Sequence, residues 1–139
     1  MKKNIRIGGA SGFWGDSYRA TSQLLKDDSL DFIVYDYLAE ITMSIMARAR
    51  AKDSTKGYAV DFVSSVLKLN LKQIADQKIK ILSNAGGVNP VACAEAIREL
   101  VKELNLDLNV SVVLGDDLID KKDQFYKLQI KEMYSNDSF

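Results

Sequence analysis

The stretch NIRIGGASGFWGDS, residues 4–17, decides the fold because a short β-branched run leads directly into four glycines. The run at residues 4–8 predicts a first strand. Asp16 or Ser17 is then suited to cap a helix that continues to about residue 26. A glycine-rich loop between a strand and a helix can present backbone N–H groups and a helix N-terminus to an anion.

The same pattern recurs along the chain, since seven of the eight glycines fall in three short stretches that each follow a predicted strand. Further strands are predicted at residues 31–35, 78–83 and 108–114, and helices at residues 38–51, 58–77, 89–104 and 118–130. This alternation favours a single α/β domain over residues 1–139. We expect a three-layer, mostly parallel, Rossmann-like sheet with helices on both faces. In such sheets, ligands bind outside the carboxyl ends of the strands.

The composition narrows the classes of function. Nineteen basic residues balance nineteen acidic ones, which gives no electrostatic case for a nucleic acid or an anionic membrane as partner. The absence of histidine excludes Ser-His-Asp catalysis and histidine-based zinc sites within this chain. No apolar run is long enough to span a bilayer, and a single cysteine fits a reducing cytoplasm. Acid–base chemistry must therefore rest on carboxylates, Lys, Tyr, Cys93 or a bound metal.

The glycine loop at residues 9–15 matches G-x-x-G-x-x-G and supplies the first candidate ligand-binding residues, Gly9, Ser11, Gly12 and Gly15. Asp36, at the end of the second strand, stands where a dinucleotide-binding fold places its ribose-binding carboxylate. The alternative is a tight turn with an aromatic plug, because Phe13 and Trp14 are bulky for a pyrophosphate site.

Asp36 and Glu40 lie four residues apart, where one helical turn would bring their side chains together. Either of them is a candidate general base beside the glycine loop. The alternative is that Asp36 caps the helix while Glu40 interacts favourably with its positive end.

The loop after the third strand supplies four more candidate ligand-binding residues, Asn84, Gly86, Gly87 and Asn89. Asn84 ends the strand, and a ligand-facing amide and a turn role are both open for it. Asn89 followed by Pro90 is typical of an N-cap with proline at the first helical position.

Asp116 and Asp117 follow the fourth predicted strand and Gly115. Adjacent carboxylates can bind Mg²⁺ or act as an acid–base pair, so both are candidate catalytic residues. The alternative is a solvated turn with a helix cap. Because parallel strands carry their carboxyl ends to one edge, we expect Asp36, Asn84 and Asp116 to face a common crevice. Cys93 lies on the apolar face of its helix and is expected to be a small buried residue.

These loops together resemble the N-terminal region of the acyclic terpene utilisation (AtuA) family. The matching stretches are IRIGGASGFWGDS, DFIVYDYLAEITMSIMARARAKD, GYAVDFV, ILSNAGGVNPVACAEAI and VVLGDDL. The resemblance implies an α/β domain with a role in the catabolism of acyclic or branched acids, as CoA thioesters. It also implies a longer architecture, of which this chain is the N-terminal part, and so a missing segment or partner chain that completes the site.

The resulting hypothesis is a cytoplasmic enzyme domain that acts on a small carboxylate or an acyl-CoA by hydratase or lyase chemistry. Such reactions remove a proton next to a carbonyl, and carboxylates suffice for that. Two alternatives stay open: a dinucleotide-dependent oxidoreductase domain, and a non-catalytic binding or assembly module completed by a homo-oligomer or a partner chain. The sequence identifies no cofactor and no metal.

Overall fold

The computed structural model of the chain describes residues 4–138. Its strands are β1 (Ile7–Ser11), β2 (Phe32–Tyr35) and β3 (Lys80–Ser83). Its α-helices are α1 (Ala20–Leu24), α2 (Glu40–Lys52), α3 (Lys68–Asp76), α4 (Pro90–Glu103) and α5 (Lys122–Lys127). A π-helical segment, η1 (Phe62–Leu67), precedes α3, and a 3₁₀ turn, η2 (Ile119–Lys121), precedes α5. The predicted α/β class is confirmed.

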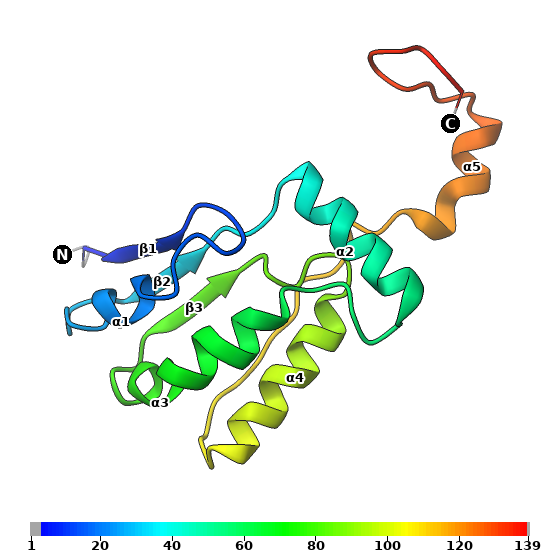
Figure 1. Ribbon diagram of the computed structural model, residues 1–139. Helices are drawn as coiled ribbons and strands as arrows, with labels where there is room; N and C mark the ends of the chain where they lie inside the picture. The colour runs from blue at the N-terminus through cyan, green and yellow to red at the C-terminus, as the bar shows by residue number, and fades with distance from the viewer. Residues whose placement is uncertain (1–3, 139) are drawn as a thin grey trace.

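The three strands form one parallel sheet in the order β1-β2-β3 (Figure 1). The first strand lies three residues later than predicted, because the glycines continue it rather than end it. Gly8 pairs with Ile33 and Gly9 with Val34. The apolar run of β2 therefore holds a glycine stretch that has little strand propensity of its own.

The fourth predicted strand, at residues 108–114, is wrong: among residues 4–138 no ladder hydrogen bonds join this segment to the sheet. The segment follows α4, and the alternation of its apolar side chains does give it one buried side. Leu106, Leu108 and Val110 pack against the core. Arg98 of α4 donates from Nη2 to the carbonyl oxygen of Val110 at 2.8 Å, so a side chain occupies an acceptor that a neighbouring strand would use.

One face of the sheet is covered by helices. Tyr35 of β2 lies on that face, where it hydrogen-bonds Thr21 of α1 at 2.9 Å and meets the ring of Phe62 in η1 edge-to-face at 5.1 Å. Tyr37 adds a third ring to the same cluster, and such ring pairs contribute about 0.5–1.5 kcal/mol each beyond burial of their area. Ile33, at the centre of β2, is completely buried.

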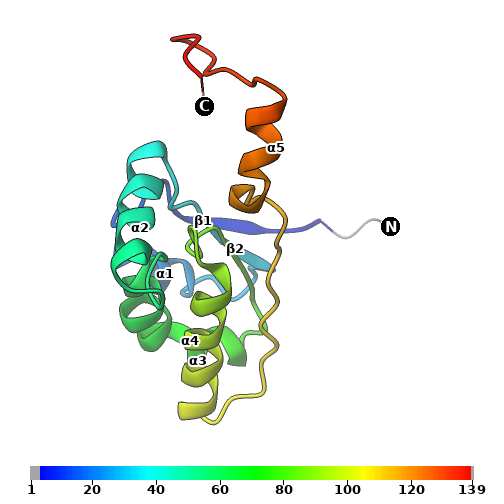
Figure 2. The ribbon, with the colours of Figure 1, turned by 90° about the vertical axis from the view of Figure 1, so that its right-hand side faces the viewer.

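The opposite face is not covered in the same way. The alternate side chains Ile7 and Leu82 point away from the helices and are 62% and 50% exposed. The helices α1 and α3 gather to one side of the strands in both views (Figures 1 and 2). The expected three-layer arrangement with helices on both faces is therefore not confirmed for residues 4–138.

The predicted helices at residues 38–51, 58–77 and 89–104 correspond to α2, η1 with α3, and α4. The first helix is shorter than predicted, since α1 has five residues and its N-cap position is Arg19, which has no capping side chain. The predicted C-terminal helix is reduced to η2 and α5, which project away from the α/β body (Figures 1 and 2). Among the described residues, no helix has the length and apolar character needed to cross a membrane.

Cys93 lies inside the core, as its place on the apolar face of α4 predicts, and is only 4% exposed. Burial raises the pKa of its thiol from the ordinary value of 9.0 to about 11, because the thiolate loses solvation there. The folded chain therefore holds this proton at a pH where the unfolded chain has released it.

This difference predicts an alkaline loss of stability. The contribution of Cys93 is complete below about pH 9 and is lost as the pH rises through about 11, at a cost of roughly 2–3 kcal/mol. Urea unfolding of wild type and Cys93→Ala across this range checks it. The variant has no thiol to titrate, so its free energy of unfolding should decline less steeply. Parallel curves for the two proteins would contradict the prediction.

Candidate functional site

The ends of the three strands meet at one edge of the sheet, where Asp36 and Asn84 are in direct contact. The side-chain amide of Asn84 donates from Nδ2 to Oδ1 of Asp36 at 2.7 Å. The hydroxyl of Ser11, at the end of β1, donates to the backbone oxygen of Asp36 at 3.4 Å. Three of the predicted site residues, each from a different strand end, are thereby brought together.

Asn84 is bonded at both ends of its amide. Besides the bond to Asp36, its Oδ1 accepts a hydrogen bond from the backbone N–H of Tyr37 at 2.7 Å. The amide thus joins the loop after β3 to the loop after β2 and fixes the carboxylate of Asp36. Both bonds lie within the protein and give Asn84 a positioning role, which is neither of the two roles predicted for it; a ligand-facing amide stays a prediction.

Asp36 does not cap a helix, so the capping alternative for this residue is wrong. The helix α2 begins at Glu40, its N-cap position is Ala39, and the hydroxyl of Thr42 accepts the backbone N–H of Ala39 at 2.6 Å. Since Asp36 precedes the helix in an extended segment, one helical turn does not bring it to Glu40. Glu40 is exposed in the first turn of α2, where a negative charge is favourable.

The glycine loop is closed by its own carboxylate. The backbone N–H of Gly12 donates to Oδ2 of Asp16 at 2.9 Å, and Gly15 takes up the left-handed backbone with φ +85°. The helix α1 begins only at Ala20, four residues after Asp16. One loop amide is therefore already paired with an anionic group, and no helix N-terminus directly follows the glycines.

Trp14 attaches the loop to the helical layer, which agrees with the aromatic-plug alternative. Its indole Nε1 donates to Oδ1 of Asp61 at 2.6 Å, and Asp61 directly precedes η1. Tyr37 lies nearby: burial raises the pKa of its phenol, and the negative charge of Asp61 raises that pKa further. Sequence reasoning missed Asp61, because an isolated aspartate before an apolar helical run carries no motif.

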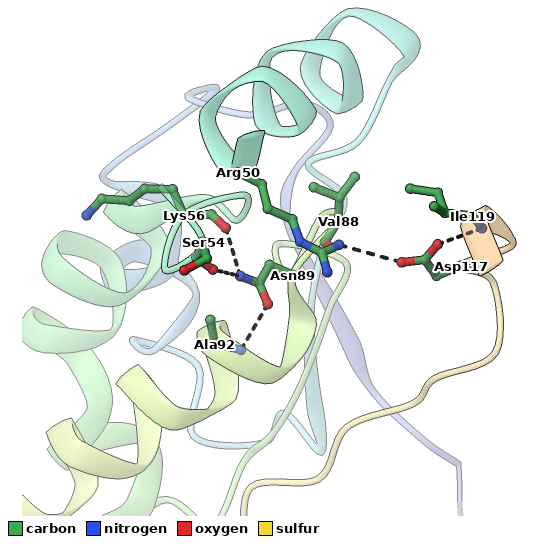
Figure 3. Close-up of polar contacts among 8 residues, drawn as sticks. All are labelled: Arg50, Ser54, Lys56, Val88, Asn89, Ala92, Asp117 and Ile119. Atoms are coloured by element: carbon green, nitrogen blue, oxygen red, sulfur yellow. Dashed lines mark hydrogen bonds and ion pairs between the residues drawn. The ribbon is translucent and has the colours of Figure 1, made fainter. Parts of the chain in front are cut away.

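The loop after β3 is shaped by packing against residues 54–57 (Figure 3). Asn89 caps α4 by accepting from the N–H of Ala92 at 3.4 Å, as predicted, and its Nδ2 donates to the carbonyl oxygens of Ser54 and Lys56 at 2.9 and 2.8 Å. This packing accounts for Asn89 without a ligand.

Gly86 and Gly87 are explained by the same close packing. A Cβ on Gly87, which has φ +55°, would meet Sδ of Met46 and would lie 2.7 Å from the carbonyl oxygen of Gly57. A Cβ on Gly86 would lie 2.8 Å from Cβ of Pro90. Their predicted ligand-binding role remains a prediction, while their structural role is plain from the geometry.

Asp116 and Asp117 are not joined to the Asp36 site, since no fourth strand carries them to the edge. Asp117 instead lies 3.5 Å from Nη1 of Arg50, which also donates to the carbonyl oxygen of Val88 at 2.5 Å (Figure 3). Its other oxygen accepts the N–H of Ile119 at 3.1 Å, which fits the turn part of the alternative reading; the N-cap position of η2 is Leu118 and no side chain caps it.

Asp116 is exposed and makes no hydrogen bond or ion pair with another residue of the described range 4–138. Within that range, no group of three or more His, Cys, Asp or Glu side chains is arranged to hold a metal ion. The pairing of Asp116 and Asp117 as Mg²⁺ ligands stays a prediction, because two carboxylates with water in the other positions can hold Mg²⁺.

A hollow of about 470 Å³ lies between residues 54–58 and the first turns of α4. The residues that line it include Lys56, Tyr58, Asn89, Glu95 and Glu99. Asp36 and Asn84 do not line this hollow, whereas Asn89 does. The predicted site residues are therefore divided between the hollow and the strand-end site around Asp36.

A family model described as Acyclic terpene utilisation family protein AtuA matches residues 5–138. No curated protein and no solved structure shows significant similarity to the chain.

The surroundings of Gly87 and Gly9 predict different changes in stability when a methyl group is added to each. Gly87→Ala should lower the free energy of unfolding by at least about 2 kcal/mol, from the left-handed backbone and the contacts with Met46 and Gly57. Gly9→Ala is the matched control, since no atom lies within 4 Å of its added Cβ, and should change stability by less than about 0.5 kcal/mol. Urea denaturation measures both. Equal effects would show that the packing around Gly87 is looser than described.

Proposed function

This chain belongs to the acyclic terpene utilisation family, and on that premise we propose that it is an enzyme domain with hydratase or lyase chemistry. Its substrates would be acyclic or branched carboxylic acids or their CoA thioesters. The single observation that supports the proposal is the exposed carboxylate of Asp36, held by the amide of Asn84 at the carboxyl ends of the strands.

Asp36 is suited to act as a general base. Only its Oδ1 is used by Asn84, and Oδ2 makes no hydrogen bond with another residue among 4–138. A carboxylate with one oxygen fixed and the other free can accept the proton from the carbon next to a carbonyl. In a dehydration, the proton taken by Asp36 passes to the β-hydroxyl, which leaves as water while the carbon–carbon double bond forms, and the reverse reaction adds water. Glu40 is the second candidate carboxylate on this side of the sheet.

The glycine loop favours this chemistry over the dinucleotide-dependent alternative. A pyrophosphate needs free loop amides and a helix N-terminus directly behind them. Here the N–H of Gly12 is paired with Asp16, and the five-residue α1 starts well after the loop. The carboxylate of Asp16 would also repel a phosphate.

A second candidate function is an assembly module whose site is completed by another chain. The observation that favours it is the sheet face bearing Ile7 and Leu82, which no helix of the described residues covers. Parallel sheets are normally covered on both faces.

Ligand binding can be followed through Trp14, the one tryptophan in the chain, because it lies in the glycine loop. Branched acyclic 2-enoyl-CoA thioesters should change its fluorescence, and NAD(H) should not. A response to NAD(H) alone would favour the oxidoreductase alternative.

Asp36→Asn should lower the rate of hydration of such a thioester by about 10²–10⁴-fold, because the amide cannot accept the proton. Its free energy of unfolding should stay within about 1 kcal/mol of wild type, since Asn can still accept the bond from Asn84. Asp107→Asn, on an exposed aspartate outside the site, is the matched control and should leave the rate unchanged. Wild-type turnover in Asp36→Asn would remove Asp36 as the base.

A further inference from the structure

The uncovered side of the sheet is an ordered apolar surface, here called the open face. Strand register sets its side chains in two rows across the three strands, Ile7–Phe32–Lys80 and Gly9–Val34–Leu82. Among residues 4–138, no atom lies within 4 Å of the place where a Cβ of Gly9 would stand, so the space beside this position of β1 is open. A parallel sheet with one apolar face left bare is unusual and requires a cover.

The same chain carries a second apolar surface, which none of the described residues covers. Residues 118–134, here called the C-terminal arm, project away from the α/β body in both views (Figures 1 and 2). Large apolar side chains are exposed along its whole length: Leu118, Ile119, Tyr126, Leu128, Ile130, Met133 and Tyr134. Exposure reaches 74% at Ile119 and 80% at Met133, so these apolar side chains are largely in contact with water in a single chain.

We propose that the C-terminal arm of one copy covers the open face of a second copy, and that the exchange is reciprocal. A two-fold dimer of this kind buries both apolar surfaces of both chains through one self-complementary interface. The arm is better placed to reach the open face of a second copy than the open face of its own chain. Its first residue follows Asp117, which lies 3.5 Å from Arg50 of α2, and the arm leads outward from there.

Size agrees with this occupant, and charge does not oppose it. The open face carries a single charge, Lys80, and the arm carries three acidic residues against four lysines: Asp120, Asp123 and Glu132, and Lys121, Lys122, Lys127 and Lys131. Counting one arm and one face, each copy contributes about two dozen residues, within the roughly 20–30 residues a side of a standard stable interface. The chain has a formal net charge of zero, so two copies do not repel each other.

Light scattering on the full chain tests the proposal. Wild type should have twice the 15.5 kDa mass of one chain. The arm variant Ile119→Asp/Leu128→Asp and the face variant Ile7→Lys should both be monomeric, and circular dichroism should show both folded because the changed positions are exposed in one chain. Leu69→Asp, on the solvent side of α3 at 79% exposure, is the matched control and should remain a dimer.

Mixing the two monomeric variants sharpens the test. The arm variant keeps an intact face and the face variant keeps an intact arm, so one of the two contacts can form and a heterodimer should appear at higher concentration. Dimers that persist in both variants would place the interface elsewhere and overturn the proposal. A monomeric wild type would also overturn the proposal. In that case, an arm protected from proteolysis would lie on the sheet of its own chain, and an arm that is cleaved rapidly would be undocked.

Discussion

The structure depends on the central position of β2, whose side chains serve both the core and the site. Ile33 is completely buried, Tyr35 anchors α1 and η1 through its hydroxyl and its ring, and the strand holds β1 and β3 on either side. Asp36 follows directly. The pairing register of β2 with β1 and β3 fixes where the neighbouring strands end. Ser11 and Asn84 therefore lie beside Asp36.

Sequence patterns predicted those elements whose signal is local. The continuous apolar run of β2 and the Asn–Pro start of α4 were placed within one or two residues. The fourth strand failed because period-two alternation reports one buried side and says nothing about a hydrogen-bonding neighbour. Residues 108–114 have the buried side, while the carbonyl of Val110 is bound by Arg98 instead of by a strand.

The candidate site, like the fold, was predictable only in part. Topology alone gathers Asp36, Asn84 and Ser11, because parallel strands end at one edge. The same argument failed for Asp116 and Asp117, because the strand that was expected to place them at this edge does not form. It also could not identify Asp61, whose link to Trp14 crosses 47 positions and follows only from the packing of η1 against the glycine loop. Asn89 and Gly87 show the converse, since residues of an apparent ligand motif also have a structural role in packing.

The pairing of Asp16 with the amide of Gly12 bears on which form of a substrate the site can admit. Asp16, Asp36 and Asp61 are three carboxylates around the ends of β1 and β2, and the local potential is accordingly negative. A free carboxylic acid would enter as an anion against that potential. The same acyl chain joined to a carrier as an ester or thioester is neutral at its reactive end. On the proposed function, an acyl chain activated as an ester or thioester would therefore meet less repulsion beside Asp36 than the free acid.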